Sequence, residues 1–137
     1  NGLGLVTEGE MSEATTQNIR VHVEPVYHPA QSNPARNFWF FSYTVKISNT
    51  GNIPVQLLSR RWVITDATGK TEHVKGAGVV GNRPMLGPGE SFQYTSSCPL
   101  STSMGSMHGS YQMITENGDN FDAEIAPFSL CDPMLMN

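Results

Sequence analysis

The chain has 137 residues, of which 38% are hydrophobic and 15% charged, and this length fits one domain whose core needs no metal or disulfide to fold. Its 12 acidic and 8 basic residues give a net charge of −4, which argues against a general nucleic-acid binder because such proteins carry a basic excess. No apolar run approaches the roughly 18 residues that a membrane span requires. We therefore expect neither a nucleic-acid partner nor a membrane partner.

The first segment of the chain differs in composition from the rest. Residues 1–17 are polar, glycine-rich and acidic without a clear period, so we expect a flexible N-terminal arm or linker there. From Ile19 apolar residues alternate with polar ones, which predicts a half-buried strand. Three prolines then predict a loop over residues 25–36, because each removes a backbone donor and restricts its predecessor.

The most regular strand is predicted from Trp39 to Ile47, where the odd-numbered residues are apolar and the even-numbered ones are mostly polar. The segment Asn-Thr-Gly-Asn at 49–52 is a strong turn signal that ends this strand. We expect the odd-numbered aromatic residues to lie in the core. Phe38 or Phe40, of the opposite parity, is a candidate for an exposed contact.

The next predicted strand changes its inward parity. Val55 and Leu57 are odd-numbered, whereas Trp62 and Ile64, further along, are even-numbered. A slip of one residue would turn every side chain to the other face, so we predict a β-bulge near residues 58–61.

Period-two segments and turn signals continue to the end of the chain. Further strands are expected around residues 72–75, 92–95, 111–113 and 121–125, and Asn117-Gly118 is expected to form a hairpin connection. Seven or eight short strands with no convincing helix predict an all-β fold, an antiparallel immunoglobulin or fibronectin type III-like β-sandwich. We assign this domain to residues 18–132 and a C-terminal tail to residues 133–137.

Cys98 and Cys131 are the only cysteines. Two thiols do not make a dense disulfide framework, so we expect free, largely buried thiols in a reducing compartment. This favours an intracellular protein, cytoplasmic, or organellar if the chain is part of a longer targeted eukaryotic protein.

The glycine-rich segment Gly76-Ala77-Gly78-Val79-Val80-Gly81 is the main candidate site. A dinucleotide fingerprint needs such glycines before a helix, and no helical pattern follows here. One interpretation is a structural junction, where glycines take positive φ or allow close packing. The other is an anion nest, in which loop amides and nearby cations hold a pyrophosphate or nucleotide. The residues of this candidate nest are Arg60, Arg61, Lys75, Gly76, Gly78 and Gly81, with Arg83 nearby.

No set of residues in the sequence suggests catalysis or metal binding. The four histidines, at positions 22, 28, 73 and 108, match no zinc spacing, and no serine lies in a Gly-x-Ser-x-Gly elbow. The acidic residues near the C-terminus lack the ligand pattern of an EF-hand loop. We therefore expect no catalytic residue, no metal site and no cofactor, and we expect that the protein is not an enzyme.

Five segments resemble sequence elements of the ApaG family and follow one another in the family's order. They are VQLLSRRW at 55–62, GAGVVG at 76–81, PMLGPGESFQYTS at 84–96, MHGSYQM at 107–113 and IAPFSL at 125–130. The resemblance extends from about Ile19 to Leu130. It implies a fibronectin type III-like sandwich. One departure is visible at Arg61, where many members carry histidine, so no metal role for that histidine can be transferred.

The resemblance also bears on function. ApaG domains, including the bacterial CorD-type protein, occur alone or as C-terminal modules of eukaryotic proteins, among them an F-box protein and a mitochondrial partner of DNA polymerase. The bacterial proteins are linked to cobalt resistance and magnesium efflux, and nucleotide binding has been proposed for the family.

These observations favour a non-enzymatic interaction module that presents a sheet face or a loop end to another protein. The alternative is a weak nucleotide- or pyrophosphate-binding protein linked to divalent-cation (cobalt and magnesium) homeostasis, with the glycine loop as its site. A homodimer is compatible with both. Chemical shifts of the loop glycine amides during an anion titration would separate the two functions.

Overall fold

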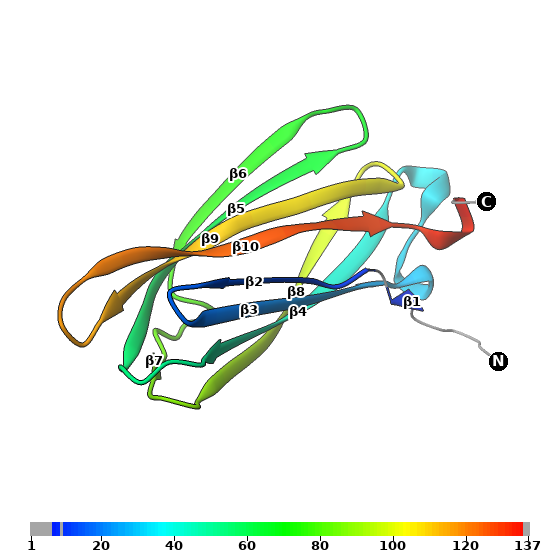
Figure 1. Cartoon of the computed structure of the whole chain (residues 1–137). Coiled ribbons are helices and arrows are strands. Elements are labelled where there is room, and N and C mark those ends of the chain that lie inside the picture. Colours follow the sequence, from blue (N-terminus) through cyan, green and yellow to red (C-terminus); the bar gives the residue numbers. More distant parts are fainter. Residues whose placement is uncertain (1–6, 9, 136–137) are drawn as a thin grey trace.

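The computed structural model describes residues 7–8 and 10–135, which form two antiparallel sheets packed face to face (Figure 1). The first sheet contains β1 (Thr7–Glu8), β2 (Ser12–Thr16), β3 (Ile19–Tyr27), β4 (Trp39–Asn49) and β8 (Ser91–Leu100). The second contains β5 (Val55–Asp66), β6 (Thr71–Ala77), β7 (Met85–Leu86), β9 (Met104–Thr115) and β10 (Asn120–Cys131). The main strand orders are β3-β4-β8 and β10-β9-β5-β6. The predicted fibronectin type III-like sandwich is confirmed.

Helical structure in the described chain is limited to three single turns of 3-10 helix, which are η1 (Pro29–Gln31), η2 (Pro34–Arg36) and η3 (Pro133–Leu135). Each begins with a proline, whose fixed φ suits the first helical position. No helix in residues 7–8 and 10–135 is long and apolar enough to cross a lipid bilayer.

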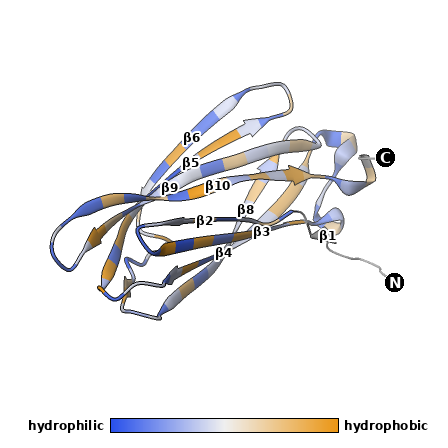
Figure 2. Ribbon diagram, viewed as in Figure 1, coloured by the Kyte–Doolittle hydropathy of each residue, from blue (hydrophilic) through white to orange (hydrophobic). Residues whose placement is uncertain are grey.

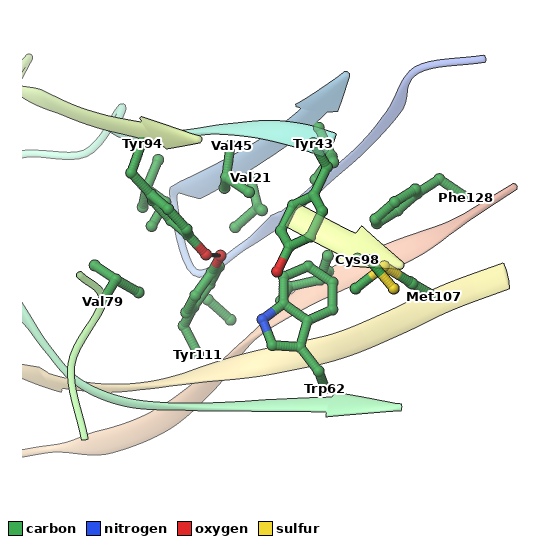
Figure 3. Close-up of a cluster of buried hydrophobic side chains, with 14 of the residues drawn as sticks. Val21, Tyr43, Val45, Trp62, Val79, Tyr94, Cys98, Met107, Tyr111 and Phe128 are labelled. Carbon is green, nitrogen blue, oxygen red and sulfur yellow. Dashed lines mark hydrogen bonds between the residues drawn. The ribbon is translucent and has the colours of Figure 1, made fainter. Parts of the chain in front are cut away.

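The core follows from the alternation that the sequence predicted. Odd-numbered residues of β3 and β4 point inward and are buried, and orange and blue alternate along β3 in Figure 2. Trp62 lies at the centre, with its ring 5.1 Å from that of Tyr43 and 6.0 Å from that of Phe128. Such tilted and edge-on contacts are favourable for aromatic rings, and the contact between Tyr43 and Trp62 joins the two sheets (Figure 3).

The β-bulge predicted in the third long strand is confirmed. Leu57 lies opposite Met113 and Ser59 lies opposite Gln112, so Leu58 has no partner on β9. The extra residue shifts the alternation by one position. Leu57 and Trp62 therefore both point into the core despite their different parity.

The predicted flexible arm over residues 1–17 is wrong where the structure describes it. Thr7–Glu8 pairs with the end of β3, and Ser12–Thr16 pairs with Ile19–Val23. Backbone pairing along the edge of β3 stabilises this polar segment, which has no apolar alternation of its own. Residues 1–6 and 9 lie outside the described residues, as do residues 136–137 of the predicted tail. The domain limits at 18 and 132 remain a prediction.

The predicted loop over residues 25–36 is wrong in its first part, because β3 continues through Pro25 to Tyr27. Pro25 pairs with Tyr43 of β4 on one side. On the other side it lies between the residues that pair with β2 and those that pair with β1. A strand tolerates proline at such an interruption, because no ladder hydrogen bond is lost there.

Asn49 is a buried polar residue that joins the β4–β5 connection to β7 at one end of the sandwich. Its Nδ2 donates to the carbonyl oxygens of Ile53 (2.8 Å) and Leu86 (2.9 Å), and its Oδ1 accepts from the Gly51 amide (3.0 Å). Sequence reasoning identified this asparagine only as part of a turn. Its 2% exposure shows that it is a structural residue of the interior.

Both cysteines are free, as predicted. Cys98 is buried, and burial raises the pKa of its thiol from 9.0 to about 11. Cys131 is half-buried, and desolvation also raises its pKa. Neither thiol has the low pKa of a reactive cysteine.

Candidate functional site: the outer face of β5 and β6

The β5–β6 hairpin carries most of the residues of the predicted anion nest, but it separates the two arginines. Arg60 lies opposite Gly76 and Arg61 lies opposite Lys75. Successive side chains of a strand point to opposite faces. Arg60 therefore shares the inner face with Trp62, and Arg61 shares the outer face with Lys75.

Arg60 stabilises the glycine loop. Its Nη1 donates to the carbonyl oxygens of Ala77 (3.1 Å) and Gly78 (2.8 Å). The guanidinium group lies against Gly76, where an added Cβ would come within 2.7 Å of it. The missing side chain at position 76 makes room for the arginine, and these contacts occupy donors that the nest hypothesis assigned to an anion.

The glycine loop is built as a structural junction. Gly78 has a φ of +61°, and its amide donates to the carbonyl oxygen of Leu58 (2.9 Å). The amides of Val79 and Asn82 donate to each other's carbonyl oxygens (2.8 Å each) across a tight turn. Val79 is buried in the core beside Tyr94 and Tyr111 (Figure 3). The Gly78 amide therefore already has an acceptor within the protein.

The tip of this turn is exposed and strained. Val80 has a φ of +41° with 58% of its surface exposed, and Gly81 has a φ of +79°. A positive φ is unusual for a β-branched residue. Gly81 is exposed and has no heavy atom within 4 Å of the position that a Cβ would occupy.

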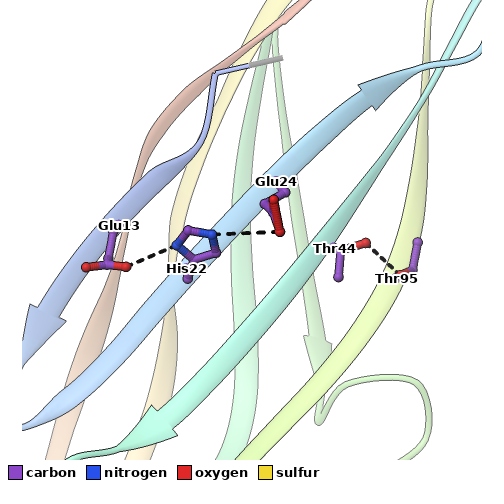
Figure 4. A network of polar contacts seen from close by, with 5 residues as sticks. All are labelled: Glu13, His22, Glu24, Thr44 and Thr95. Carbon is purple, nitrogen blue, oxygen red and sulfur yellow. Dashed lines mark hydrogen bonds and ion pairs between the residues drawn. The ribbon is translucent and has the colours of Figure 1, made fainter. Parts of the chain in front are cut away.

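Arg61 and Lys75 form an exposed basic pair on the outer face of the second sheet. They are direct cross-strand neighbours, and like charges in this arrangement repel each other. Among residues 10–134, the ion pairs within 4.0 Å are those of His22 with Glu13 and Glu24 on the other sheet (Figure 4). No acidic side chain of the described chain therefore neutralises Arg61 or Lys75.

A shallow groove of about 400 Å³ lies beside this pair. Its lining residues are Ser59, Arg60, Arg61, Lys75, Gly76 and Gln112. Ser59 donates through Oγ to Oε1 of Gln112 (2.9 Å), whose Nε2 donates to Oγ of Ser110 (2.9 Å). The groove thus combines three positive charges, of which Arg60 is already bonded to loop carbonyl oxygens, with the hydroxyl group of Ser59 and the amide group of Gln112.

The charge of the side chains on the outer face of the second sheet changes from positive to negative across the sheet. His73 and His108 lie on either side of Val63, which is two residues further along β5 than Arg61. On β10, at the opposite edge, Glu124 lies opposite Ser110, and Asp122 lies opposite Gln112. The same face is therefore basic over β5 and β6 and acidic over β10.

Tyr94 and Tyr111 have strongly raised pKa values, but they lie in the packed core. The hydroxyl groups of Tyr94 and Tyr111 are hydrogen-bonded to each other. Burial raises the pKa of both tyrosines well above the ordinary value, and it also raises the pKa of Tyr43. Among residues 10–134, no three His, Cys, Asp or Glu side chains come together as a metal site.

Comparisons with known proteins agree with this architecture. The sequence profile described as "ApaG domain" matches residues 29–115. The chain belongs to the ApaG family. Protein ApaG of Anaeromyxobacter dehalogenans is 52% identical over 127 residues, which cover 93% of this chain and all of that protein. Protein ApaG of Bradyrhizobium diazoefficiens is 51% identical over 123 residues, which cover 90% of this chain and 95% of that protein.

Solved structures extend the agreement to three dimensions. The ApaA protein of Bordetella pertussis has a TM-score of 0.83 and 47% identity, with 88% of this chain and 98% of that chain covered. The matched ApaG-domain region includes the basic pair and the glycine loop. The ApaG-type resemblance seen in the sequence is therefore confirmed, whereas a role for any single site residue remains a prediction.

Proposed function

We propose that this ApaG-type domain is a non-enzymatic interaction module that binds an acidic segment of another protein on the outer face of β5 and β6. The observation that supports this proposal is the Arg61–Lys75 pair, which no acidic side chain of the described residues neutralises. Adjacent like charges destabilise a hairpin slightly. An acidic partner would offset that repulsion and would steer its own association.

The shape of the site favours a polypeptide over a small ligand. The groove is shallow, and its cations lie on an open sheet face. Ser59 and Gln112 add polar groups that can exchange their mutual hydrogen bond for bonds to a partner. Weak contacts spread along a sheet face suit a chain of carboxylates.

A small anion such as pyrophosphate is the alternative ligand. The groove of about 400 Å³ is large enough for it, and Arg61 and Lys75 would supply the charge. The loop would contribute less than a nest does, because the Gly78 amide already donates to Leu58. The link to divalent cations rests on the family resemblance alone.

The compartment is part of the same proposal. Cys98 and Cys131 are free, and free thiols are usual in the reducing interior of a cell. We therefore place the interaction inside the cell.

The test is a titration of the labelled protein with a polyglutamate peptide and, separately, with pyrophosphate, observed through backbone amide resonances. We expect the peptide to shift amides around Arg61 and Lys75, with the effect decreasing as salt is added. The double variant Arg61→Gln/Lys75→Gln should lose these shifts. Arg20→Gln/Lys46→Gln removes the same two charges from the exposed face of the other sheet and should keep them.

Three results would contradict the proposal. Shifts spread evenly over both faces would indicate non-specific charge attraction. Shifts that persist in Arg61→Gln/Lys75→Gln would exclude this pair. Saturation by pyrophosphate below about 1 µM, with no response to the peptide, would favour the small-anion alternative.

A further inference from the structure

The sandwich has four strand edges, and three of them carry features that oppose further strand pairing. Native proteins protect edges with charged side chains, bulges or short strands. β6 carries Glu72, His73 and Lys75. β2 has only five residues, one of which is Glu13.

The β10 edge is also protected. Its register with β9 shifts between Ile125 and Phe128, and it carries Asp122 and Glu124. The Glu124 amide donates to Oγ1 of Thr16 on β2 (3.1 Å), so these two edges face each other. Neither edge is free to add another strand.

β8 carries one protective feature, Pro99 near its C-terminal end, and lacks charged side chains, a bulge and a short length. Its sequence, SFQYTSSCPL, has no charged residue, and its register with β4 runs without a shift from Ser91 to Leu100. Within the described part of the chain it pairs with β4 alone. Ten uncharged residues in regular register form the kind of edge to which another strand can add.

The orientation of the β8 backbone can be derived from the ladder. The Asn49 amide donates to the Glu90 carbonyl oxygen (2.9 Å), in line with the β4–β8 register. Hydrogen-bonded and non-bonded pairs alternate in an antiparallel ladder. The backbone groups of Gln93, Thr95 and Ser97 therefore point away from β4. Pro99, which has no N–H to donate, occupies another outward position of the same series.

We propose that β8 pairs antiparallel with β8 of a second copy of this chain, with the two-fold axis at Thr95. This register places Gln93 opposite Ser97 of the other copy and Ser91 opposite Pro99. Every outward pair is then uncharged, so the edge is complementary to itself. A charged partner strand would gain no ion pair from it.

The side chains on the outer face support the same register. Oγ1 of Thr44 and Oγ1 of Thr95 are 2.8 Å apart on neighbouring strands (Figure 4). Pairing at Thr95 would continue this row through Thr95 and Thr44 of the second copy. Cross-strand threonine pairs stabilise sheets. The interface lies on the first sheet and is separate from the Arg61–Lys75 face of the second.

The test compares the wild-type chain with Thr95→Glu and with Thr15→Glu. Thr95→Glu places two carboxylates together at the two-fold axis, whereas Thr15→Glu adds the same charge to an exposed threonine of β2. We expect sedimentation equilibrium to show the average mass of the wild type and of Thr15→Glu rising to twice that of one chain as the protein concentration is raised to about 1 mM. Thr95→Glu should stay monomeric, with a circular dichroism spectrum like that of the wild type.

A second measurement reports on the register. In Thr95→Cys, mild oxidation should link two copies through position 95, because directly opposite residues bring their Cβ atoms close. The amides of Gln93, Thr95 and Ser97 should exchange with solvent at least about tenfold more slowly at the highest concentration than in dilute solution. A monomeric wild type, a dimeric Thr95→Glu, or cross-linking no faster than in Thr15→Cys would each overturn the proposal.

Discussion

Gly78 and Gly81 lie in the same turn and both have a positive φ, but their surroundings differ. A Cβ at Gly78 would lie 2.2 Å from the carbonyl oxygen of Asn82, which belongs to the backbone and cannot swing aside. A Cβ at Gly81 would meet no heavy atom within 4 Å. The two glycines therefore separate the cost of backbone conformation from the cost of steric overlap.

We expect Gly78→Ala to lower the free energy of unfolding by clearly more than Gly81→Ala does. The left-handed conformation costs an alanine roughly 1–2 kcal/mol at either position, and only Gly78→Ala adds a collision with Asn82. Urea unfolding of both variants measures the difference. Equal losses would mean that the turn around Asn82 relaxes without cost.

The candidate site was only partly predictable at the level of single residues. The sequence identified Arg60, Arg61 and Lys75 as a basic cluster but placed both arginines in one nest. Strand alternation separates them, and the parity change at the bulge decides which of the two faces inward. No sequence signal indicated that Arg60 would donate to loop carbonyl oxygens 17 and 18 residues away.

At the scale of elements, apolar alternation predicted the long strands well and the edge strands poorly. β4 was predicted because its inward residues from Trp39 to Ile47 are all apolar. β2 was missed because its sequence, SEATT, has no apolar alternation. It is a strand because β3 offers it a free edge, and that information is tertiary.

The bulge in β5 leads to a prediction about deletions. Leu58 is the residue without a partner on β9, so its removal leaves Leu57 and Trp62 on the inner face of a regular ladder. We expect the deletion to fold, with a loss of about 1–3 kcal/mol because the Gly78 amide loses its acceptor. Deleting Thr44 from the regular strand β4 should prevent folding, because part of its inward set would turn outward.

Circular dichroism and thermal unfolding of the two deletions provide the measurement. A folded Thr44 deletion would show that the β4 register can adjust. An unfolded Leu58 deletion would show that the bulge itself is required, for example for the strand bend that it introduces.

At the scale of the whole molecule, one buried thiol and three buried tyrosine hydroxyl groups make the free energy of unfolding depend on pH in the alkaline range. Burial raises the pKa of Cys98 to about 11, and it raises the pKa of Tyr43, Tyr94 and Tyr111 above their ordinary 10.0. The folded protein therefore keeps these protons at pH values where the unfolded chain loses them. Their contribution to stability is complete below the unfolded pKa values and decreases as pH rises towards the folded ones.

We expect the urea midpoint to stay level near neutral pH and to fall as pH rises from about 9 to 11 and beyond. The double variant Tyr94→Phe/Tyr111→Phe removes two of the groups and both partners of one hydrogen bond. It should fold and lose less stability over the same pH range. A midpoint that stays constant to pH 11 in the wild type would contradict this linkage.

In the first sheet β4 lies between β3 and β8, so the sheet can be completed during synthesis only after β8 has been made. Thr44 on β4 and its neighbour Thr95 on β8 are 51 residues apart in sequence. Ribosomes add roughly 5–20 residues per second, so β4 waits about 3–10 s for its second neighbour. During that interval a strand whose inward residues are almost all apolar has one edge unpaired. The nascent chain, rather than the finished sandwich, is therefore the stage at which this protein is most exposed to aggregation.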